Sequence, residues 1–287
     1  MSNQILVTGS TGTVGSLLIK ELLAGKASFT AMVRNPEKAK AFKDIGVDVV
    51  MGDFTKPETL NAALKGREKV FLLSGPEPRQ VELQGNLVQA AKKAGVKHLV
   101  KLSALGAGLF SPVTLLRRHG QTEKEIEEAG MAFTHLRPHY FMQNTLMFSG
   151  TVASQGAFYG PFEAMRISMV DARDVAAVAA STLTRPGHEN KAYDITGPES
   201  LSMADVATKL SSATGKPVNF VVVSPQDARK GMVSMGMPDW LADGLMELLG
   251  SWTNGNGSRV TNVVKEATGR PARTYEAFAG EHAQAFK

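Results

Sequence analysis

Three glycines, Gly9, Gly12 and Gly15, lie three residues apart directly after the first apolar run of the chain. That run, Ile5–Val7, predicts a strand, and the apolar spacing of the next residues predicts a helix. In this context the first glycine permits a tight turn, the second lets the backbone approach a pyrophosphate, and the third lets helix and strand pack closely. The first helical turn would offer free N–H groups to the phosphates. The residues expected to bind a dinucleotide are Gly9, Ser10, Thr11, Gly12, Thr13 and Val14. A turn with only a structural role is the alternative.

The second expected strand ends in a cation, where an acidic residue would favour NAD(H). Asp or Glu at this position hydrogen-bonds the ribose hydroxyls of NAD(H), whereas this strand ends in Val33-Arg34-Asn35. A guanidinium can form paired hydrogen bonds with a phosphate, and Lys38 lies one helical turn further on. We therefore expect Arg34 and Lys38 to bind a 2′-phosphate, which gives NADP(H) preference over NAD(H). A solvated strand end is the alternative for Arg34.

Two more strand ends are candidates for cofactor contacts. Asp53 follows the third strand, where its carboxylate could accept a hydrogen bond from an adenine amino group with Phe54 beside the ring. An aspartate that caps a helix or forms a turn is an equal alternative. After the fourth strand, Leu73, Ser74 and Gly75 would let the backbone pass close to the cofactor ribose, unless they form a plain turn.

Strands and helices that would position these residues alternate through the first half of the chain. The expected strands are Ile5–Val7, Phe29–Val33, Val47–Met51, Lys69–Leu73, Lys97–Leu102 and Ala132–Leu136. The expected helices are Val14–Leu23, Pro36–Ile45, Pro57–Leu64, Gln80–Ala94 and Leu115–Ala129. This alternation predicts βαβ units and therefore an α/β fold, a Rossmann-type doubly wound parallel sheet with a smaller C-terminal substrate lobe.

The regular alternation ends near Arg137, and loops are expected at 156–161, 197–200 and 253–257. We expect residues 1–137 to form the dinucleotide-binding domain, with further elements returning from about 138–195. Residues 196–287 should form a smaller mixed α/β lobe that binds substrate. Such a lobe should pack at the carboxyl ends of the strands, where open α/β sheets bind their ligands.

The composition argues against several other classes of protein. The chain has 287 residues, 43% of them hydrophobic and 21% charged, as is usual for a globular protein. It has no cysteine, which excludes a disulfide framework, a thiolate metal site and a cysteine nucleophile. The net charge of +5 is not gathered on one helix or stripe, so no nucleic-acid partner is expected.

Motifs for other chemistry are missing from the sequence. The six histidines include no H-E-x-x-H pair, so no metal is expected. A P-loop and a G-x-S-x-G elbow are also missing. No apolar run reaches about 18 residues, so no membrane span is expected, and the first residues do not resemble a signal peptide. We therefore expect a cytoplasmic protein.

Several short segments together resemble the NmrA-like branch of the atypical short-chain dehydrogenases/reductases. They are Val7–Gly12, Val33–Ala39, Gly52–Asp53, Ala94–His98, Leu102–Ser103, His119–Glu123, Leu136–Pro138 and Asp171–Ala176. The resemblance covers nearly the whole chain and implies the Rossmann fold and a nicotinamide cofactor. It implies the reaction only loosely, because the branch contains quinone and dye reductases as well as proteins that sense the cofactor.

The resemblance also locates candidates for catalysis. Most short-chain dehydrogenases use a Tyr-x-x-x-Lys pair, which none of the four tyrosines of this chain forms. The corresponding helix has His119 and Glu123 four residues apart, similar to the His-x-x-Thr-Glu of quinone and dye reductases of the branch. The carboxylate would hold the imidazole charged. His119 would then have one of two roles: it donates a proton, or it only supports the cofactor site. Ser103 matches a serine beside the cofactor, and either bonds a substrate oxygen or satisfies the backbone.

The segment after the sixth strand would pass near the nicotinamide by the same resemblance. Pro138 would shape the backbone there, and His139, Tyr140 and Phe141 could face the acceptor, unless the segment simply turns into a core helix. A later methionine-rich region containing Met235 and Trp240 suits either a plastic apolar pocket or ordinary core.

These features lead to one expected function and two alternatives. The expected function is NADPH-dependent hydride transfer to a quinone-like, dye-like or other conjugated small apolar acceptor, by a monomer or homodimer. The first alternative is a regulatory protein that senses NADP(H) without turnover. The weaker alternative is a carbonyl or imine reductase in which Ser103 and His119 replace the usual pair.

Overall fold

The computed structural model of the chain describes residues 4–287, which divide into two compact units. Unit 1 runs up to Ser111 and continues in Leu116–Arg137 and Val175–Asp194. Unit 2 consists of Pro112–Leu115, Pro138–Asp174 and Ile195–Lys287. Unit 2 therefore contains residues 138–174 in addition to the lobe expected from the sequence at 196–287.

Unit 1 is built on a seven-stranded sheet with the strand order β3-β2-β1-β4-β5-β6-β9. Its strands are β1 (Ile5–Val7), β2 (Phe29–Val33), β3 (Asp48–Met51), β4 (Lys69–Leu72), β5 (His98–Leu102), β6 (Ala132–Pro138) and β9 (Lys191–Ile195). Strands β1 to β6 all pair in parallel. The order reverses at β1, which lies between β2 and β4 and therefore provides the switch point of a doubly wound fold. The predicted fold class is confirmed.

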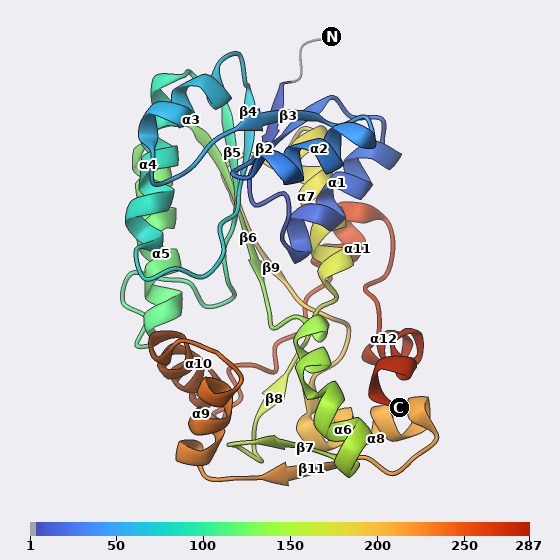
Figure 1. Ribbon diagram of the computed structural model, residues 1–287. Coiled ribbons are helices and arrows are strands. Elements are labelled where there is room, and N and C mark those ends of the chain that lie inside the picture. Colours follow the sequence, from blue (N-terminus) through green and yellow to red (C-terminus); the bar gives the residue numbers. More distant parts are fainter. Residues whose placement is uncertain (1–3) are drawn as a thin grey trace. The chain divides into compact units, whose positions relative to one another are not determined.

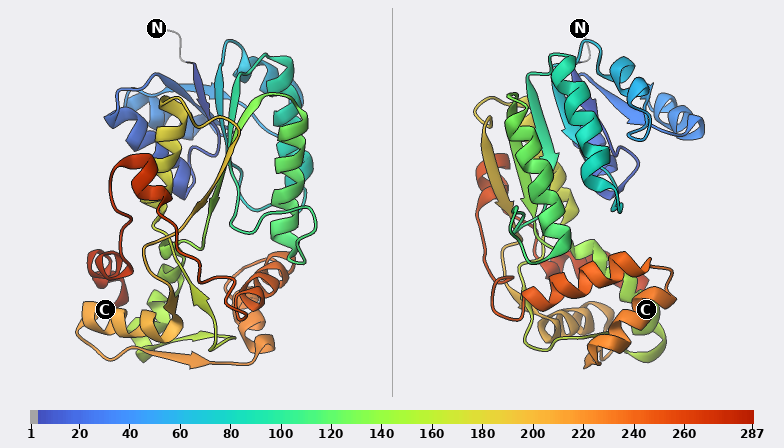
Figure 2. Two further views of the ribbon diagram at one scale, coloured as in Figure 1. Left: turned by 180° about the vertical axis from the view of Figure 1, so that it is seen from behind. Right: turned by 90° about the vertical axis from the view of Figure 1, so that its left-hand side faces the viewer.

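Helices cover both faces of this sheet (Figures 1 and 2). On one face lie α1 (Thr13–Ala24), α2 (Pro36–Asp44) and α7 (Ala172–Thr184). On the other lie α3 (Pro57–Leu64), α4 (Gln80–Lys93) and α5 (Thr114–Glu128). Every residue of β1, β2 and β5 is buried, as expected for parallel strands covered on both sides.

Unit 2 contains two small sheets and a set of helices. Strand β7 (Ala157–Gly160) pairs in parallel with β11 (Asn219–Val222), and β8 (Arg166–Ile167) pairs antiparallel with β10 (Leu201–Ser202). The α-helices are α6 (Ser149–Gln155), α8 (Met203–Thr214), α9 (Pro225–Ser234), α10 (Asp239–Ser251), α11 (Val263–Thr268) and α12 (Tyr275–Glu281). Two 3-10 helices are η1 (Met142–Phe148) and η2 (Ala283–Phe286). The core of unit 2 includes the fully buried rings of Phe158, Tyr275 and Phe278.

One expected loop, at residues 156–161, is wrong. Its central residues form β7, because their backbone groups pair with β11 about sixty residues further along the chain. Ala157 and Phe158 are buried there, while Gly156, with φ of 65°, ends the preceding helix. A short strand with so distant a partner leaves little local pattern in the sequence.

Candidate active site

The glycine turn between β1 and α1 is shaped by two glycines that no other residue could replace without strain. Gly9 has φ of 60°, and a Cβ there would lie 2.6 Å from the Leu73 side chain. A Cβ on Gly15 would lie 2.1 Å from the carbonyl oxygen of Gly9. At Gly12 a Cβ would meet only one atom, at 3.4 Å, and no side chain caps the helix that starts there. The uncapped start of α1 therefore fits a pyrophosphate.

Two hydroxyl groups attach this turn to the sheet. The Thr8 hydroxyl donates to Phe71 O at 2.9 Å and accepts from Leu73 N at 2.9 Å. The buried Ser10 hydroxyl donates to Met32 O at 2.8 Å. The side chain of Ser10 is thus used by the fold, whereas Thr11 and Thr13 are exposed.

Arg34 and Lys38, which follow β2, are both exposed. Glu37 is the one acidic residue between them in the sequence, and its backbone N–H donates to Asn35 Oδ1 at 2.7 Å. Asp53 accepts hydrogen bonds from Thr55 N at 2.9 Å and Thr55 Oγ1 at 2.8 Å. These bonds, with a smaller contribution from Arg34, hold the pKa of Asp53 below its ordinary value.

The three positions after β3 and β4 are used differently from one another. The Asp53 carboxylate forms the turn that we gave as the alternative to adenine binding, and Phe54 packs into the core at 9% exposure. Ser74 Oγ accepts from Gln84 Nε2 at 2.8 Å. A Cβ on Gly75 would meet nothing within 4 Å, so the backbone there borders open space. Adenine and ribose contacts at these positions stay predictions.

Five polar side chains gather in unit 1, from β5 and the residue that follows it, from α5 and from β6, and we call them the polar cluster. They are Lys101, Ser103, His119, Glu123 and Arg137. The Nζ atom of the fully buried Lys101 lies 3.0 Å from His119 Nδ1. Arg137 donates two hydrogen bonds to the buried Glu123 carboxylate, at 3.0 and 2.6 Å. The expected pair of His119 with Glu123 is therefore wrong, because each has a different partner.

Because His119 contacts Lys101 and not Glu123, its imidazole is not held in the charged form that we expected from the sequence. Burial lowers the pKa of Lys101 to about 7, against the opposing charge of Glu123. Burial, reinforced by Lys101, lowers the pKa of His119 well below 6.5. Burial alone would raise the pKa of the Glu123 carboxyl, but the Arg137 hydrogen bonds together with smaller contributions from His135 and Ser103 outweigh it and lower that pKa. At neutral pH His119 is thus neutral rather than charged.

Ser103 lies at the buried end of β5, with 5% of its surface exposed. Its backbone N–H donates to Leu136 O at 2.7 Å. Its hydroxyl forms no well-directed hydrogen bond within residues 4–287, although it lies close enough to Glu123 to help lower the pKa of that carboxyl. The hydroxyl does not satisfy the backbone, which was one of its two expected roles.

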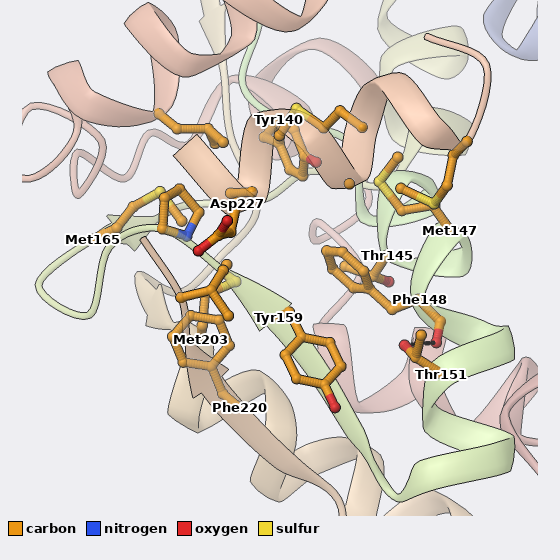
Figure 3. A pocket seen from close by; sticks show the side chains of 18 of the residues that line it. Tyr140, Thr145, Met147, Phe148, Thr151, Tyr159, Met165, Met203, Phe220 and Asp227 are labelled. Atoms are coloured by element: carbon orange, nitrogen blue, oxygen red, sulfur yellow. Dashed lines mark hydrogen bonds between the residues drawn. The ribbon is translucent and has the colours of Figure 1, made fainter. Parts of the chain in front are cut away.

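Unit 2 contains a cavity of about 460 Å³, which we call the apolar cavity (Figure 3). Most of its lining is aromatic or thioether. The lining residues include Tyr140, Met147, Phe148, Tyr159, Met165, Met203, Phe220, Met232 and Met235. The carboxyl group of Asp227 is a rare charge in this lining, and it already accepts from Ser224 Oγ at 2.6 Å. Burial raises the pKa of Tyr140 to about 12, so its phenol keeps its proton.

Some of the substrate residues predicted from the sequence line this cavity and others do not. Tyr140 and Met235 line it, whereas His139, Phe141 and Trp240 do not belong to its lining. His139 Nε2 donates to Gly257 O at 2.9 Å, and its Nδ1 accepts from Tyr140 N at 2.7 Å. Burial lowers the pKa of His139 to about 4, so both ring nitrogens of a neutral imidazole are already used by the backbone.

Phe141, Trp240 and Pro138 also have defined places. Phe141 forms an isolated backbone bridge with Val170, Trp240 lies in the first turn of α10, and Pro138 is the last residue of β6.

Two kinds of site residue were missed by the sequence analysis. Lys101 and Arg137 complete the polar cluster, and a lysine within the apolar strand His98–Leu102 was a usable indication of the first. Phe148 and Phe220 line the apolar cavity from segments some seventy residues apart, and no local pattern connects them. Within residues 4–287 no group of acidic or histidine side chains is arranged to hold a metal. No helix in the same range has the length and apolar character needed to cross a bilayer.

The doubly wound sheet, the uncapped α1 after a glycine-rich turn and the lack of a Tyr-x-x-x-Lys pair define an atypical short-chain dehydrogenase/reductase. More specifically, the chain belongs to the NmrA-like family, whose model matches residues 1–261.

Relatives within this family include characterised reductases. The chain is 45% identical over 282 residues to an NAD(P)H azoreductase of Xenophilus azovorans, covering 98% of this chain and 99% of the relative. The structure is similar to an NADPH-dependent quinone oxidoreductase of Escherichia coli in complex with NADPH, with a TM-score of 0.89, 31% identity and coverage of 96% and 99%. It is also similar to a triphenylmethane reductase of Citrobacter sp. complexed with NADP(H), with a TM-score of 0.86, 28% identity and coverage of 98% and 99%.

Proposed function

We propose that this chain is an NADPH-dependent reductase of quinones, dyes or other small conjugated apolar acceptors. The observation that carries the proposal is the uncapped start of α1 together with Arg34, which directly follows the neighbouring β2 at the position where an NAD(H) site would have an acidic residue. The azo, quinone and triphenylmethane reductases among its relatives support the same reaction class.

Bound NADPH would supply the hydride for the reaction. The backbone from Gly9 to Val14 would bind the pyrophosphate through N–H groups at the start of α1. Arg34, with Lys38 beside it, would bind the 2′-phosphate through charge-assisted hydrogen bonds. Because an acidic side chain would repel that phosphate, the missing acid matters as much as the arginine.

The apolar cavity of unit 2 would bind the ring system of the acceptor. Its volume of about 460 Å³ lies within the range of roughly 300–1,000 Å³ that small-molecule sites occupy. Flexible thioethers adapt to acceptors of different shape, and the protonated phenol of Tyr140 could donate a hydrogen bond to an acceptor oxygen. An apolar lining gains from contact with apolar surface and offers few partners to hydrated groups, which favours a flat conjugated molecule over a hydrated one.

Steady-state oxidation of NADPH tests this function. A naphthoquinone, an azo dye, a cationic triphenylmethane dye, a simple aldehyde and a cyclic imine would be compared at equal concentration with NADPH and with NADH. We expect turnover with one or more of the conjugated acceptors, and higher kcat/KM with NADPH. Tight NADPH binding without turnover of any acceptor would identify a cofactor sensor. Preference for the aldehyde or imine would identify a carbonyl or imine reductase.

We further propose that the enzyme acts in the cytoplasm as a monomer or homodimer. A chain without cysteine suits a reducing compartment. Cell fractionation and light scattering of the purified protein would test location and oligomeric state.

A further inference from the structure

Lys101 is a buried cation without an acidic hydrogen-bond partner. It lies on β5 with 0% exposure, and among residues 4–287 its Nζ forms hydrogen bonds only with Leu102 O at 3.3 Å and His119 Nδ1 at 3.0 Å. Glu123 of α5 is the nearby acid, but its two oxygens are bound by Arg137. A buried charge of this kind is costly, so a role for Lys101 is worth seeking.

Neither strand beside β5 places an acidic residue opposite Lys101. Lys101 lies opposite Leu72 of β4 and His135 of β6 in the strand register. Burial lowers the pKa of His135 to about 4, so this imidazole is neutral. His119, Glu123 and His135 are thus the titratable groups that face Lys101 from α5 and β6.

The contact between Lys101 and His119 fixes which nitrogen of the imidazole carries the proton. An ammonium group only donates hydrogen bonds, so Nδ1 of His119 must accept. The single proton of the neutral imidazole then lies on Nε2. This Nε2 has no hydrogen-bond partner within residues 4–287, and His119 keeps part of its surface exposed. A donor is therefore presented at the surface of the polar cluster, with a cation directly behind it.

We propose that Lys101 supplies, through His119, the proton that a quinone-like acceptor takes up when it is reduced; this rests on the proposed function. In the step, an oxygen anion of the reduced acceptor forms an O–H bond with the Nε2 proton of His119, whose N–H bond breaks. Nδ1 of the same ring takes a proton from Nζ of Lys101, which becomes a neutral amine. The imidazole ends neutral in its other tautomer. Before the next turnover, one proton from solvent binds to Nε2 of His119 and Nδ1 returns its proton to Nζ of Lys101, which restores the starting state.

This arrangement explains how a histidine that stays neutral can still deliver a proton. A neutral imidazole is a very weak acid on its own, and burial keeps the imidazolium form from being populated. The proton comes instead from an ammonium whose pKa burial has lowered to about 7. A general acid is most effective when its pKa lies near the working pH. Lys101 is a positioning residue, because it acts through His119.

Two acceptors with different proton requirements test the relay. Reduction of a quinone to a hydroquinone takes up one hydride and one proton, whereas a cationic triphenylmethane dye becomes neutral by taking up hydride alone. Lys101→Met replaces the ammonium with an apolar side chain of similar length. We expect the ratio of quinone to dye kcat to fall about 10²-fold, the low end for general acid catalysis. In the wild type, quinone kcat should fall above pH of about 7 with one deprotonation, and this dependence should vanish in Lys101→Met.

Two more variants separate a relay from a structural role. Lys101→Arg keeps a cation, but a guanidinium does not release a proton in this pH range, so quinone kcat should be low and flat with pH. His119→Ala should lower quinone kcat as much as Lys101→Met does, and the double variant should be no slower than either one, because the two residues act as a unit.

A spectroscopic measurement on the cofactor-free protein tests the hydrogen bond itself. In protein with ¹⁵N-labelled histidine, His119 should show a protonated Nε2 and an unprotonated Nδ1, and in Lys101→Met the two tautomers should mix. An unchanged His119 spectrum, or equal losses for quinone and dye in Lys101→Met, would overturn the relay. If the wild type reduces the dye but quinone kcat is the same in the wild type and in Lys101→Met, the relay fails while the proposed function stands. If no acceptor is reduced, both fail.

Discussion

The polar cluster of unit 1 and the apolar cavity of unit 2 differ in what a substitution takes away. In the cluster, Glu123 and Arg137 are joined by two hydrogen bonds of 2.6 and 3.0 Å, and Lys101 contacts His119 at 3.0 Å. The apolar cavity has a volume of about 460 Å³, and the side chains that line it interact mostly through van der Waals contacts. A change in the cluster leaves a charge without its partner, which is costly in a buried site. A change in the cavity leaves more room for the acceptor, so its effect should be smaller and should depend on that acceptor.

The largest effect should come from breaking the buried ion pair. Glu123→Ala leaves Arg137 without its carboxylate, with the side chains of Glu123 and Arg137 only 5% and 27% exposed. We expect the free energy of unfolding to fall by about 3–5 kcal/mol, the usual cost of removing one partner of a buried pair. Urea unfolding of both proteins measures the difference.

A surface ion pair in the same unit provides the matched control. Glu68 and Lys97 are 2.7 Å apart with side chains 36% and 71% exposed. Glu68→Ala should cost less than about 1 kcal/mol, because exposed pairs contribute little. Equal losses in Glu68→Ala and Glu123→Ala would show that burial does not distinguish the polar cluster from the surface.

The second largest effect should be a gain in stability at Lys101. Because burial lowers the pKa of Lys101 from 10.5 to about 7, the folded protein disfavours the ammonium that the unfolded chain retains. The full cost applies below pH of about 7 and is relieved as the pH rises toward 10.5. Lys101→Met should therefore raise the free energy of unfolding at pH 6 by about 1–4 kcal/mol, and this gain should shrink above pH 8.

Stability and turnover would then change in opposite directions in one variant, as expected if Lys101 is kept for function at the expense of stability. Urea unfolding at pH 6, 7, 8 and 9 measures the trend, and the exposed Lys20 of α1 supplies the control as Lys20→Met. A Lys101→Met protein less stable than the wild type at pH 6 would contradict the cost assigned to this burial.

A third prediction concerns an exposed charge of unit 1 that should matter for binding and not for stability. Arg34→Ala removes a charge-assisted pair of hydrogen bonds to the 2′-phosphate, worth about 1.5–3 kcal/mol. NADPH affinity should fall roughly ten- to a hundred-fold, while NADH affinity and urea unfolding stay the same, because Arg34 is exposed and NADH has no such phosphate. Titration of both cofactors by fluorescence checks this, and equal NADPH binding by the two proteins would refute the assignment.

The fold of the first half could be predicted from sequence because its information is local. Pro57–Leu64 and Phe29–Val33 agree residue for residue with α3 and β2, since proline starts the helix and a mostly apolar run, interrupted only by Thr30, forms the buried strand. The strand Ala157–Gly160 was missed because it exists only by pairing with β11. Local patterns therefore suffice for βαβ units and fail for small sheets with distant partners.

The site divides in the same way. The glycine turn and the end of β2 could be located from spacing alone, since the chemistry of both depends on backbone and sequence position. The partners of His119 and Glu123 could not, because spacing of four residues on a helix favours their pairing, and only the tertiary fold brings Arg137 and Lys101 to them. His139 was expected at the acceptor, whereas a backbone contact with Gly257, 118 residues away, uses its ring.

The smallest effect should come from the rim of the apolar cavity. Met147 of η1 lines the cavity with 44% of its surface exposed, so its removal should scarcely change stability. Met147→Ala should lose about 1 kcal/mol of apolar contact with a large acceptor, at roughly 0.8 kcal/mol for each buried methylene, which corresponds to about a five-fold rise in KM. The kcat should not change, because the contact is equally present before and during reduction. A short acceptor such as benzoquinone should show less of this rise than a triphenylmethane dye.

Leu23→Ala, at a side chain of 39% exposure on α1, is the control for loss of exposed apolar surface in the other unit and should leave both KM values as they are. A fall in kcat without a rise in KM in Met147→Ala would mean that this wall of the cavity acts on the reaction itself and not on fit alone, and the contrast between cluster and cavity would then no longer hold.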